Sequence, residues 1–440
     1  MLDMLAGNAS RFTPRASVAL ALLSVGACSD MDTRSLRAAA PGAGGSTGAP
    51  AAQAAAGTVG VTAAAGASAL GAAGTPSGGE ATGAEGSPNV AGGLPAAGAD
   101  GSALTPGAGA EGSAEPAVRF VGRFDRSDPA GPRFAWSGSG IIARFSGTAV
   151  GVRLAGGQQY TVLIDGEQQP TLTPTGNVDP LAVGLTPGEH VVELYRRTEA
   201  SQGEAQFLGF DFVDGELLAP PPPAARRIEI IGDSISCGYG VEGADSSCSF
   251  TPETENHYLT YGAIAARDVG AELVTVAWSG KGLVCNYGDD ATSCTDPMPL
   301  YFDRTLPQQP DSRWGFDAYQ PQAVVINLGT NDFSTDVDPS VADFEAAYVS
   351  LLERVRAAYP AASVFCTVGP LLGGADLATA RASIENAVAA RVAAGDTGVE
   401  VFELAETNPS DGYGCDYHPS PRTHEIMAEA LIDALEQLDW

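Results

Sequence analysis

Residues 227–240, RIEIIGDSISCGYG, join a short apolar run to a glycine-rich turn. The run at 228–231 has the length and composition of a buried β-strand. Further runs of this form follow, and apolar residues between the last three recur at helical spacing, as in 344–355. Strands that alternate with helices predict a parallel sheet with helices on both faces, a three-layer α/β/α domain over residues 224–440. The other strands are expected at 273–278, 324–328, 364–368 and 399–404, and a last helix at about 420–438.

Three glycine-containing loops directly follow predicted strands of this sheet, where parallel α/β sheets place their sites. The first loop carries Ser234, and a serine hydroxyl there can act as a nucleophile. The second carries Gly280 and the third Asn331. The Ser234 N–H, the Gly280 N–H and the Asn331 amide can supply the converging donors that an acyl-transfer oxyanion needs. The helix expected after Ser234 would also favour developing negative charge through its amino terminus.

A serine nucleophile requires a base, and the chain has four histidines. His190 falls in the preceding region, His257 at the start of a predicted helix, and His424 inside the last helix. His418 lies in the loop before that helix, at the end of the sheet pattern, where it can face the Ser234 loop. We therefore expect His418 to be the general base.

Two carboxylates near the predicted site, Asp233 and Asp332, could indicate a glycosidase instead. Each lies inside a loop that the serine mechanism already explains, so we assign both structural roles. The aromatic residues Trp278, Tyr239 and Trp314 could stack on a sugar ring, but core packing is the commoner fate of such side chains.

Residues 117–219 differ in composition and show short alternating runs bounded by Gly, Pro, Asp or Asn. They predict a small β-sandwich of jelly-roll type, in which Asp165-Gly166 forms a hairpin turn. Sugar binding and a purely structural role both remain open for this domain. The proline run at 220–223 marks the boundary to the α/β domain. The strands are expected at 134–136, 141–145, 150–154, 160–164, 191–195 and 207–212.

The first 28 residues have the pattern of an export signal. Arg11 and Arg15 precede an apolar run at 16–27 that is too short to span a bilayer. Small residues directly before Cys28 resemble a bacterial lipobox, which predicts lipidation of Cys28 and anchoring to a membrane. Residues 29–116 are rich in Gly, Ala and Pro, and from residue 31 onward they contain no aromatic residue, so we expect a flexible linker.

Charge and cysteine content narrow the possible partners. A formal net charge of −30 argues against nucleic acid, because phosphates would be repelled. Apart from Cys28 there are six cysteines, and an even number in an exported protein predicts disulfides. Six cysteines allow 15 pairings, and local spacing favours Cys237–Cys248 and Cys285–Cys294, which leaves Cys366 to meet Cys415. Without a tight Cys-x-x-Cys pair, zinc is not expected.

The ordered motifs Gly-Asp-Ser, Gly, Gly-x-Asn-Asp and a late His-Pro resemble those of SGNH (GDSL-type) hydrolases from residue 227 to the carboxyl terminus. The stretches IGDSISCGYG, ENHYLTYGAIAARDVGAELVTVAWSGKGL, VVINLGTNDFS and CDYHPSPRTHEIMAEAL narrow the resemblance to carbohydrate esterase family two. That family carries a jelly-roll domain before its SGNH domain. The resemblance implies Ser234 as nucleophile, His418 as base and Gly280 with Asn331 as oxyanion donors.

This resemblance further implies removal of O-acetyl groups from plant polysaccharides or their oligosaccharides, without metal or organic cofactor. Many SGNH enzymes place an orienting Asp three residues before the His, where this chain has Cys415. Asp416 is therefore expected to orient His418, with a backbone carbonyl as the alternative. A carbohydrate-binding surface lipoprotein without activity, and a lipase for long acyl chains, are the competing hypotheses.

Overall fold

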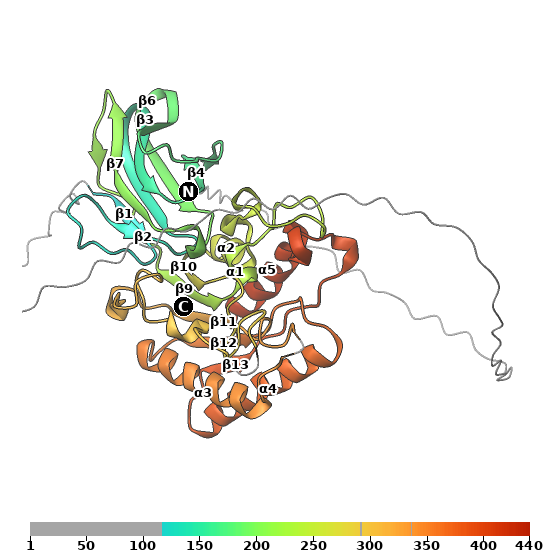
Figure 1. The fold of residues 1–440 in the computed structure, drawn as a ribbon. Helices are drawn as coiled ribbons and strands as arrows, with labels where there is room; N and C mark the ends of the chain where they lie inside the picture. Colours follow the sequence, from blue (N-terminus) through green and yellow to red (C-terminus); the bar gives the residue numbers. More distant parts are fainter. Residues whose placement is uncertain (1–116, 291–292, 336) are drawn as a thin grey trace, which may run out of the picture. The chain divides into compact units, whose positions relative to one another are not determined.

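The structure is a computed structural model that describes residues 117–290, 293–335 and 337–440 (Figure 1). The predicted export signal, Cys28 and the predicted linker lie outside the described residues. In the part of the chain that is described, no helix is both long enough and apolar enough to cross a membrane.

The first described domain is all-β, as its alternating sequence pattern predicts, and the structure pairs its eight strands in one antiparallel sheet. Its two long strands, β3 and β6, pair along most of their length with register shifts at Gly147/Ala149 and Val150/Gly151. The sheet encloses an apolar core that includes Phe134, Phe145 and Tyr160. Its strands are β1 (Arg119–Val121), β2 (Arg133–Phe134), β3 (Gly140–Gly156), β4 (Tyr160–Ile164), β5 (Glu167–Gln168), β6 (Val178–Arg196), β7 (Ala205–Val213) and β8 (Leu217–Leu218).

The hairpin predicted at Asp165-Gly166 is confirmed, because β4 and β5 pair with Ile164 opposite Glu167. Asp165 and Gly166 both have positive φ, of 53° and 82°. This is the backbone of a two-residue turn whose twist matches the flanking strands.

The second domain contains a five-stranded parallel sheet in the order β10-β9-β11-β12-β13. Nearly continuous apolar sequence forms these strands, which suits strands buried on both faces. They are β9 (Arg226–Gly232), β10 (Ala271–Ala277), β11 (Ala323–Asn327), β12 (Ser363–Thr367) and β13 (Val399–Val401).

Helices cover both faces of this sheet, so the predicted three layers are confirmed (Figure 1). The helices α2 and α5 pack with Ile228, Ile230 and Val325 on one face, and α3 and α4 pack with Val324 and Ile326 on the other. The helices are α1 (Ser234–Cys237), α2 (Tyr261–Asp268), α3 (Val341–Ala358), α4 (Gly374–Ala393) and α5 (Pro421–Leu435). Side chains of Thr260, Ser340 and Ser420 cap α2, α3 and α5.

A buried ion pair joins the two described domains. Arg123, which follows β1, donates to the Glu229 carboxylate of β9 at 3.1 Å, and both side chains are fully buried. The Tyr359 hydroxyl donates to the other carboxylate oxygen at 2.8 Å. Because isolated charges are costly to bury, each partner makes the burial of the other tolerable.

The predicted cysteine pairing is right for Cys285–Cys294 and wrong for the other two pairs. The structure pairs Cys248 with Cys415, and Cys237 and Cys366 are free and buried. Cys366 lies inside β12, and Cys237 lies on α1 close to Glu199. Proximity in sequence favoured Cys237–Cys248, but the fold brings Cys415 to Cys248 from 167 residues away.

Candidate active site

The structure brings the predicted nucleophile and base together. Ser234 is the first residue of α1, directly after β9, and His418 lies just before α5. The Ser234 Oγ and the His418 Nε2 are 2.8 Å apart, although 184 residues separate them in the sequence. A hydroxyl at hydrogen-bond distance from an imidazole nitrogen is the geometry of a serine activated by a base.

The second imidazole nitrogen faces a backbone carbonyl. His418 Nδ1 lies 3.2 Å from the carbonyl oxygen of Asp416. With the proton on Nδ1, as this partner requires, Nε2 is free to accept the proton of Ser234. Asp416 and Tyr417 both have positive φ, of 52° and 63°, and this left-handed turn carries the chain back toward the imidazole.

Beside Nδ1 the structure thus places the alternative that the sequence left open, a backbone carbonyl, and not the Asp416 carboxylate. Asp416 Oδ2 instead accepts hydrogen bonds from the Tyr239 hydroxyl at 2.9 Å and from the Phe250 N–H at 3.1 Å. The carboxylate thereby joins the His418 loop to the segment after α1. These hydrogen bonds give the Asp416 carboxylate a structural role, without a hydrogen bond to the imidazole.

Several contacts fix the loop that carries His418. The Cys248–Cys415 pair attaches it to the segment after α1, and Asp416 N donates to Cys248 O at 3.0 Å. Cys415 N donates to Gly240 O at 2.9 Å. At Gly240 a Cβ would come within 2.8 Å of the Cys415 Cβ, and φ is +60°, so glycine permits this approach.

The side chain of Tyr239 belongs to the site. In the sequence it was one of three aromatic residues that could stack on a sugar ring, and nothing distinguished it from the other two. Its ring lies 4.2 Å from the His418 imidazole and 4.3 Å from Phe250, measured between centroids. Trp278 packs on Tyr301, and Trp314 lies near Arg123. The one signal in the sequence for this place beside the histidine is that Tyr239 lies in the turn shortly after Ser234.

The predicted oxyanion donors lie in loops at the same sheet edge. Gly232 of β9 is paired with Ala277 of β10 and with Asn327 of β11, so the loops carrying Ser234, Gly280 and Asn331 leave the sheet side by side. Gly280 has φ of +77°. Among the described residues, no backbone acceptor takes up the N–H of Ser234 or of Gly280.

The Asn331 side chain bridges two of these loops. Its Nδ2 donates to Lys281 O at 2.9 Å and makes a longer contact of 3.4 Å with Asp233 Oδ2. The predicted helix after Ser234 is a single turn, so its dipole contributes little to stabilising a negative charge. The individual N–H groups therefore contribute more to binding an oxyanion.

Asp233 and Asp332 have the contacts of structural residues. Asp233 caps α1 by accepting the Ile235 N–H at 3.0 Å, and burial raises its pKa to about 7. Asp332 accepts three consecutive backbone N–H groups of the loop after Gly280, from Leu283, Val284 and Cys285. The two carboxylates therefore shape the loops around the serine.

Electrostatics suit His418 to act as a base. Burial lowers its pKa to about 4, and hydrogen bonds to the Asp416 and Cys415 backbone oppose this effect without cancelling it. The imidazole is therefore neutral at neutral pH. A neutral imidazole can accept the serine proton directly.

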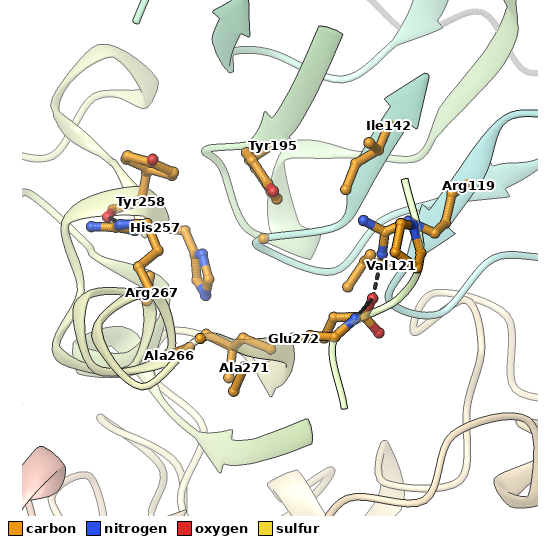
Figure 2. Close-up of a pocket in the computed structure, with 16 residues that line it drawn as sticks. Arg119, Val121, Ile142, Tyr195, His257, Tyr258, Ala266, Arg267, Ala271 and Glu272 are labelled. Carbon is orange, nitrogen blue, oxygen red and sulfur yellow. Dashed lines mark hydrogen bonds and ion pairs between the residues drawn. The ribbon is translucent and has the colours of Figure 1, made fainter. Parts of the chain in front are cut away.

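The other histidines have different partners. His257 Nε2 lies 2.8 Å from the Thr275 hydroxyl, His190 pairs with Asp165, and His424 accepts the Tyr261 N–H. His257 also lines a cavity of about 270 Å³, together with Tyr195, Arg267 and Glu272 (Figure 2). Neither Ser234 nor His418 lines this cavity, so it is separate from the site.

Across the described ranges, one group of side chains has the spacing for a metal ion. It consists of Glu199, Cys237 and Glu255, whose donor atoms lie within 4.8 Å of one another. Both carboxylates have protein hydrogen-bond partners. Glu199 comes from the antiparallel domain, and nothing in its local sequence indicated a place near the serine.

Comparisons with known proteins agree with this architecture. A family model described as "Carbohydrate esterase 2 N-terminal" matches residues 120–222, and one described as "GDSL-like Lipase/Acylhydrolase family" matches residues 230–426. A solved carbohydrate esterase of family two from Clostridium thermocellum, in complex with cellohexaose, is 43% identical with a TM-score of 0.70. The match covers 73% of this chain and 98% of that one.

Two curated relatives extend the comparison. Cellulase/esterase CelE of Acetivibrio thermocellus is 46% identical over 336 residues, which are 74% of this chain and 40% of that protein. The chain thus spans less than half of the length of CelE. An acetylxylan esterase / glucomannan deacetylase of Cellvibrio japonicus is 27% identical over 324 residues, 71% of this chain and 87% of that protein.

The parallel sheet with its serine after β9 and histidine before α5 defines a GDSL-type, or SGNH, hydrolase domain. The antiparallel domain before it matches the amino-terminal domain of carbohydrate esterase 2, which narrows the assignment from SGNH hydrolases in general to one family. The chain belongs to carbohydrate esterase family two.

Proposed function

We propose that this protein is a serine esterase that removes O-acetyl groups from plant cell-wall polysaccharides or oligosaccharides. The observation that carries the proposal is the 2.8 Å contact between Ser234 Oγ and His418 Nε2. The relatives support the substrate class, since one is named as a deacetylase and another was solved with a cello-oligosaccharide.

The proposed reaction begins when Ser234 Oγ attacks the acetyl carbonyl carbon and passes its proton to His418 Nε2. The N–H groups of Ser234 and Gly280 stabilise the negative oxygen of the tetrahedral intermediate, together with the Nδ2 hydrogen of Asn331 that otherwise makes only the longer, 3.4 Å contact with Asp233. The sugar alcohol leaves with the proton from His418, and an acetyl group remains on Ser234. His418 then removes a proton from water, which attacks the acetyl-serine, and acetate is released as His418 returns this proton to Ser234 Oγ.

During each proton transfer His418 becomes an imidazolium. The Asp416 carbonyl oxygen accepts the Nδ1–H and is the group that stabilises this cation. The site is thus proposed to work as a Ser–His dyad oriented by a backbone dipole. No step requires a metal ion or an organic cofactor.

Hydrolysis of 4-nitrophenyl acetate by the wild type and by Ser234→Ala tests this function. We expect the variant to lose at least about 10³-fold in kcat, because the nucleophile is absent. Equal rates for the two proteins would contradict the assignment. Acetate release from a panel of acetylated xylans and glucomannans would then identify the preferred polysaccharide.

Two competing functions give different results in these assays. A non-catalytic carbohydrate-binding protein would bind glycans without releasing acetate. A lipase would prefer long acyl chains, whereas we expect the rate to fall as the acyl chain of the 4-nitrophenyl ester lengthens. The serine and the histidine lie at hydrogen-bond distance, and this geometry favours the esterase over the non-catalytic binding protein.

We also infer that the protein is exported and anchored by a lipid on Cys28. The basic and apolar leader and the small residues before Cys28 support this inference. Labelling with a radioactive fatty acid during expression should mark the wild type and leave Cys28→Ser unlabelled. Equal labelling of both would contradict lipidation at Cys28.

A further inference from the structure

One carboxylate of the antiparallel domain reaches the loop that carries the proposed oxyanion donor. Glu199 lies between β6 and β7, and its side chain is buried. Glu199 Oε2 accepts the backbone N–H of Ser279 at 2.6 Å. Ser279 directly precedes Gly280, so this hydrogen bond fixes the peptide adjacent to the Gly280 N–H.

The same carboxylate also faces the helix that begins with Ser234. The thiol of Cys237, three residues after Ser234, lies within hydrogen-bond reach of Glu199. Burial, with the neighbouring Glu199 and Glu255 carboxylates, raises the pKa of this thiol well above its usual value. The thiol is therefore protonated and can donate to Glu199. One side chain thus contacts both the nucleophile helix and the oxyanion loop.

A second buried carboxylate holds Glu199 in place. Glu255 Oε1 accepts the Glu199 backbone N–H at 3.0 Å, and burial raises the pKa of Glu255 well above its usual value. Arg196 donates to the Glu199 carbonyl oxygen at 2.9 Å, and Arg197 donates to the Glu255 carbonyl oxygen at 3.3 Å. The Ser201 hydroxyl completes the partners of the Glu199 carboxylate.

We propose that Glu199 is a positioning residue for ester hydrolysis, through which the antiparallel domain sets the oxyanion loop relative to Ser234. The proposal rests on the proposed esterase function and deepens it. Oxyanion donors must be aligned before reaction to lower the barrier, and a small displacement of such a group is costly. The antiparallel domain then acts as a part of the enzyme's catalytic framework.

The variants Glu199→Ala and Glu199→Gln test this role. We expect Glu199→Ala to lower kcat for 4-nitrophenyl acetate by about ten- to a hundredfold with KM changed less than about threefold, because the donor is displaced while substrate contacts remain. In Glu199→Gln the amide oxygen can still accept the Ser279 N–H. Its amide N–H₂ can face Glu255 Oε2, which has no hydrogen-bond partner in the described structure. This variant should therefore keep kcat within about threefold of the wild type.

Glu229→Gln is the matched control, because Glu229 is another buried carboxylate at the contact between the domains, paired with Arg123. It should lower the melting temperature without changing kcat of the folded protein. Ser201→Ala removes a different Glu199 partner but keeps the contact with Ser279, so it should lower kcat less than Glu199→Ala does. Treatment with a chelator should also leave the wild-type kcat unchanged, because the proposal assigns Glu199 to hydrogen bonding.

The outcomes separate this inference from the proposed function. If the wild type is active and Ser234→Ala is not, but Glu199→Ala has the wild-type kcat, the esterase assignment stands and the positioning role is wrong. Equal losses of kcat in Glu199→Ala and Glu229→Gln, or a loss on chelation, would also overturn it. A wild type without esterase activity would instead contradict the proposed function itself.

Discussion

The imidazole of His418 lies between the hydroxyl of Ser234, 2.8 Å from Nε2, and the carbonyl oxygen of Asp416, 3.2 Å from Nδ1. A carboxylate usually takes the second position in a serine triad. Here the carboxylate of Asp416 itself contacts Tyr239 and Phe250 instead. The imidazolium that forms during reaction is therefore stabilised by a peptide dipole, and this difference has measurable consequences.

Replacement of Asp416 by Asn should have a modest effect on catalysis. The backbone carbonyl that orients His418 remains, and only the contacts with Tyr239 and Phe250 weaken. We expect kcat to fall less than about tenfold, compared with the roughly 10⁴-fold loss when the orienting carboxylate of a true triad becomes an amide. His418→Ala is the control and should lose most of the activity. A loss in Asp416→Asn close to that of His418→Ala would show that the carboxylate orients the histidine.

The pH dependence of kcat/KM should reveal the lowered pKa of His418. The base must be neutral, so activity is lost as the pH falls through its pKa in the free enzyme. Burial places this pKa at about 4, below the ordinary value for histidine. We expect activity to be nearly constant from neutral pH down to about 5 and to decline below it, for a substrate that does not itself titrate. Initial rates in overlapping buffers measure this limb, and a midpoint at or above the ordinary histidine value would contradict it.

The two disulfides should contribute differently to stability and activity. Cys248–Cys415 closes a sequence separation of 167 residues, and Cys285–Cys294 closes one of 9. The chain-entropy argument gives stabilisation of roughly 5 and roughly 3 kcal/mol, respectively. Cys248→Ser should therefore lower the free energy of unfolding more than Cys294→Ser, as urea denaturation can measure.

The same pair of variants tests the anchoring of the histidine loop. Cys415 lies three residues before His418, so Cys248→Ser should also lower kcat under conditions where the protein stays folded. A larger loss of stability in Cys294→Ser, or an unchanged kcat in Cys248→Ser, would argue against this role of the Cys248–Cys415 pair.

Much of the fold followed from local sequence. The apolar run before Ser234 and the spacing of Phe344 to Val355 predicted β9 and α3, because buried strands and helices leave different periods of apolar residues. The approach of His418 to Ser234 could be predicted because both lie in loops at one end of a sheet pattern. These features depend on short stretches of chain and on the general geometry of parallel sheets.

Other features depend on contacts that no local pattern records. The left-handed backbone at Asp416 and Tyr417 places a carbonyl where a carboxylate was expected. Cys248 meets Cys415, and Glu199 meets Ser279, only after distant segments have packed. Spacing between cysteines therefore predicted a local pair correctly and the two other pairs wrongly.

Trapping of the acetyl-enzyme shows directly whether Ser234 is the nucleophile. The full chain would be mixed with excess 4-nitrophenyl acetate, quenched in acid within the first turnovers, digested and analysed by mass spectrometry. We predict one acetyl group on the peptide that contains Ser234, absent from Ser234→Ala and longer-lived at lower pH, where deacylation by His418 slows. Acetate release by the wild type with no acetyl group on Ser234, matched by equal release from Ser234→Ala, would contradict nucleophilic catalysis by Ser234.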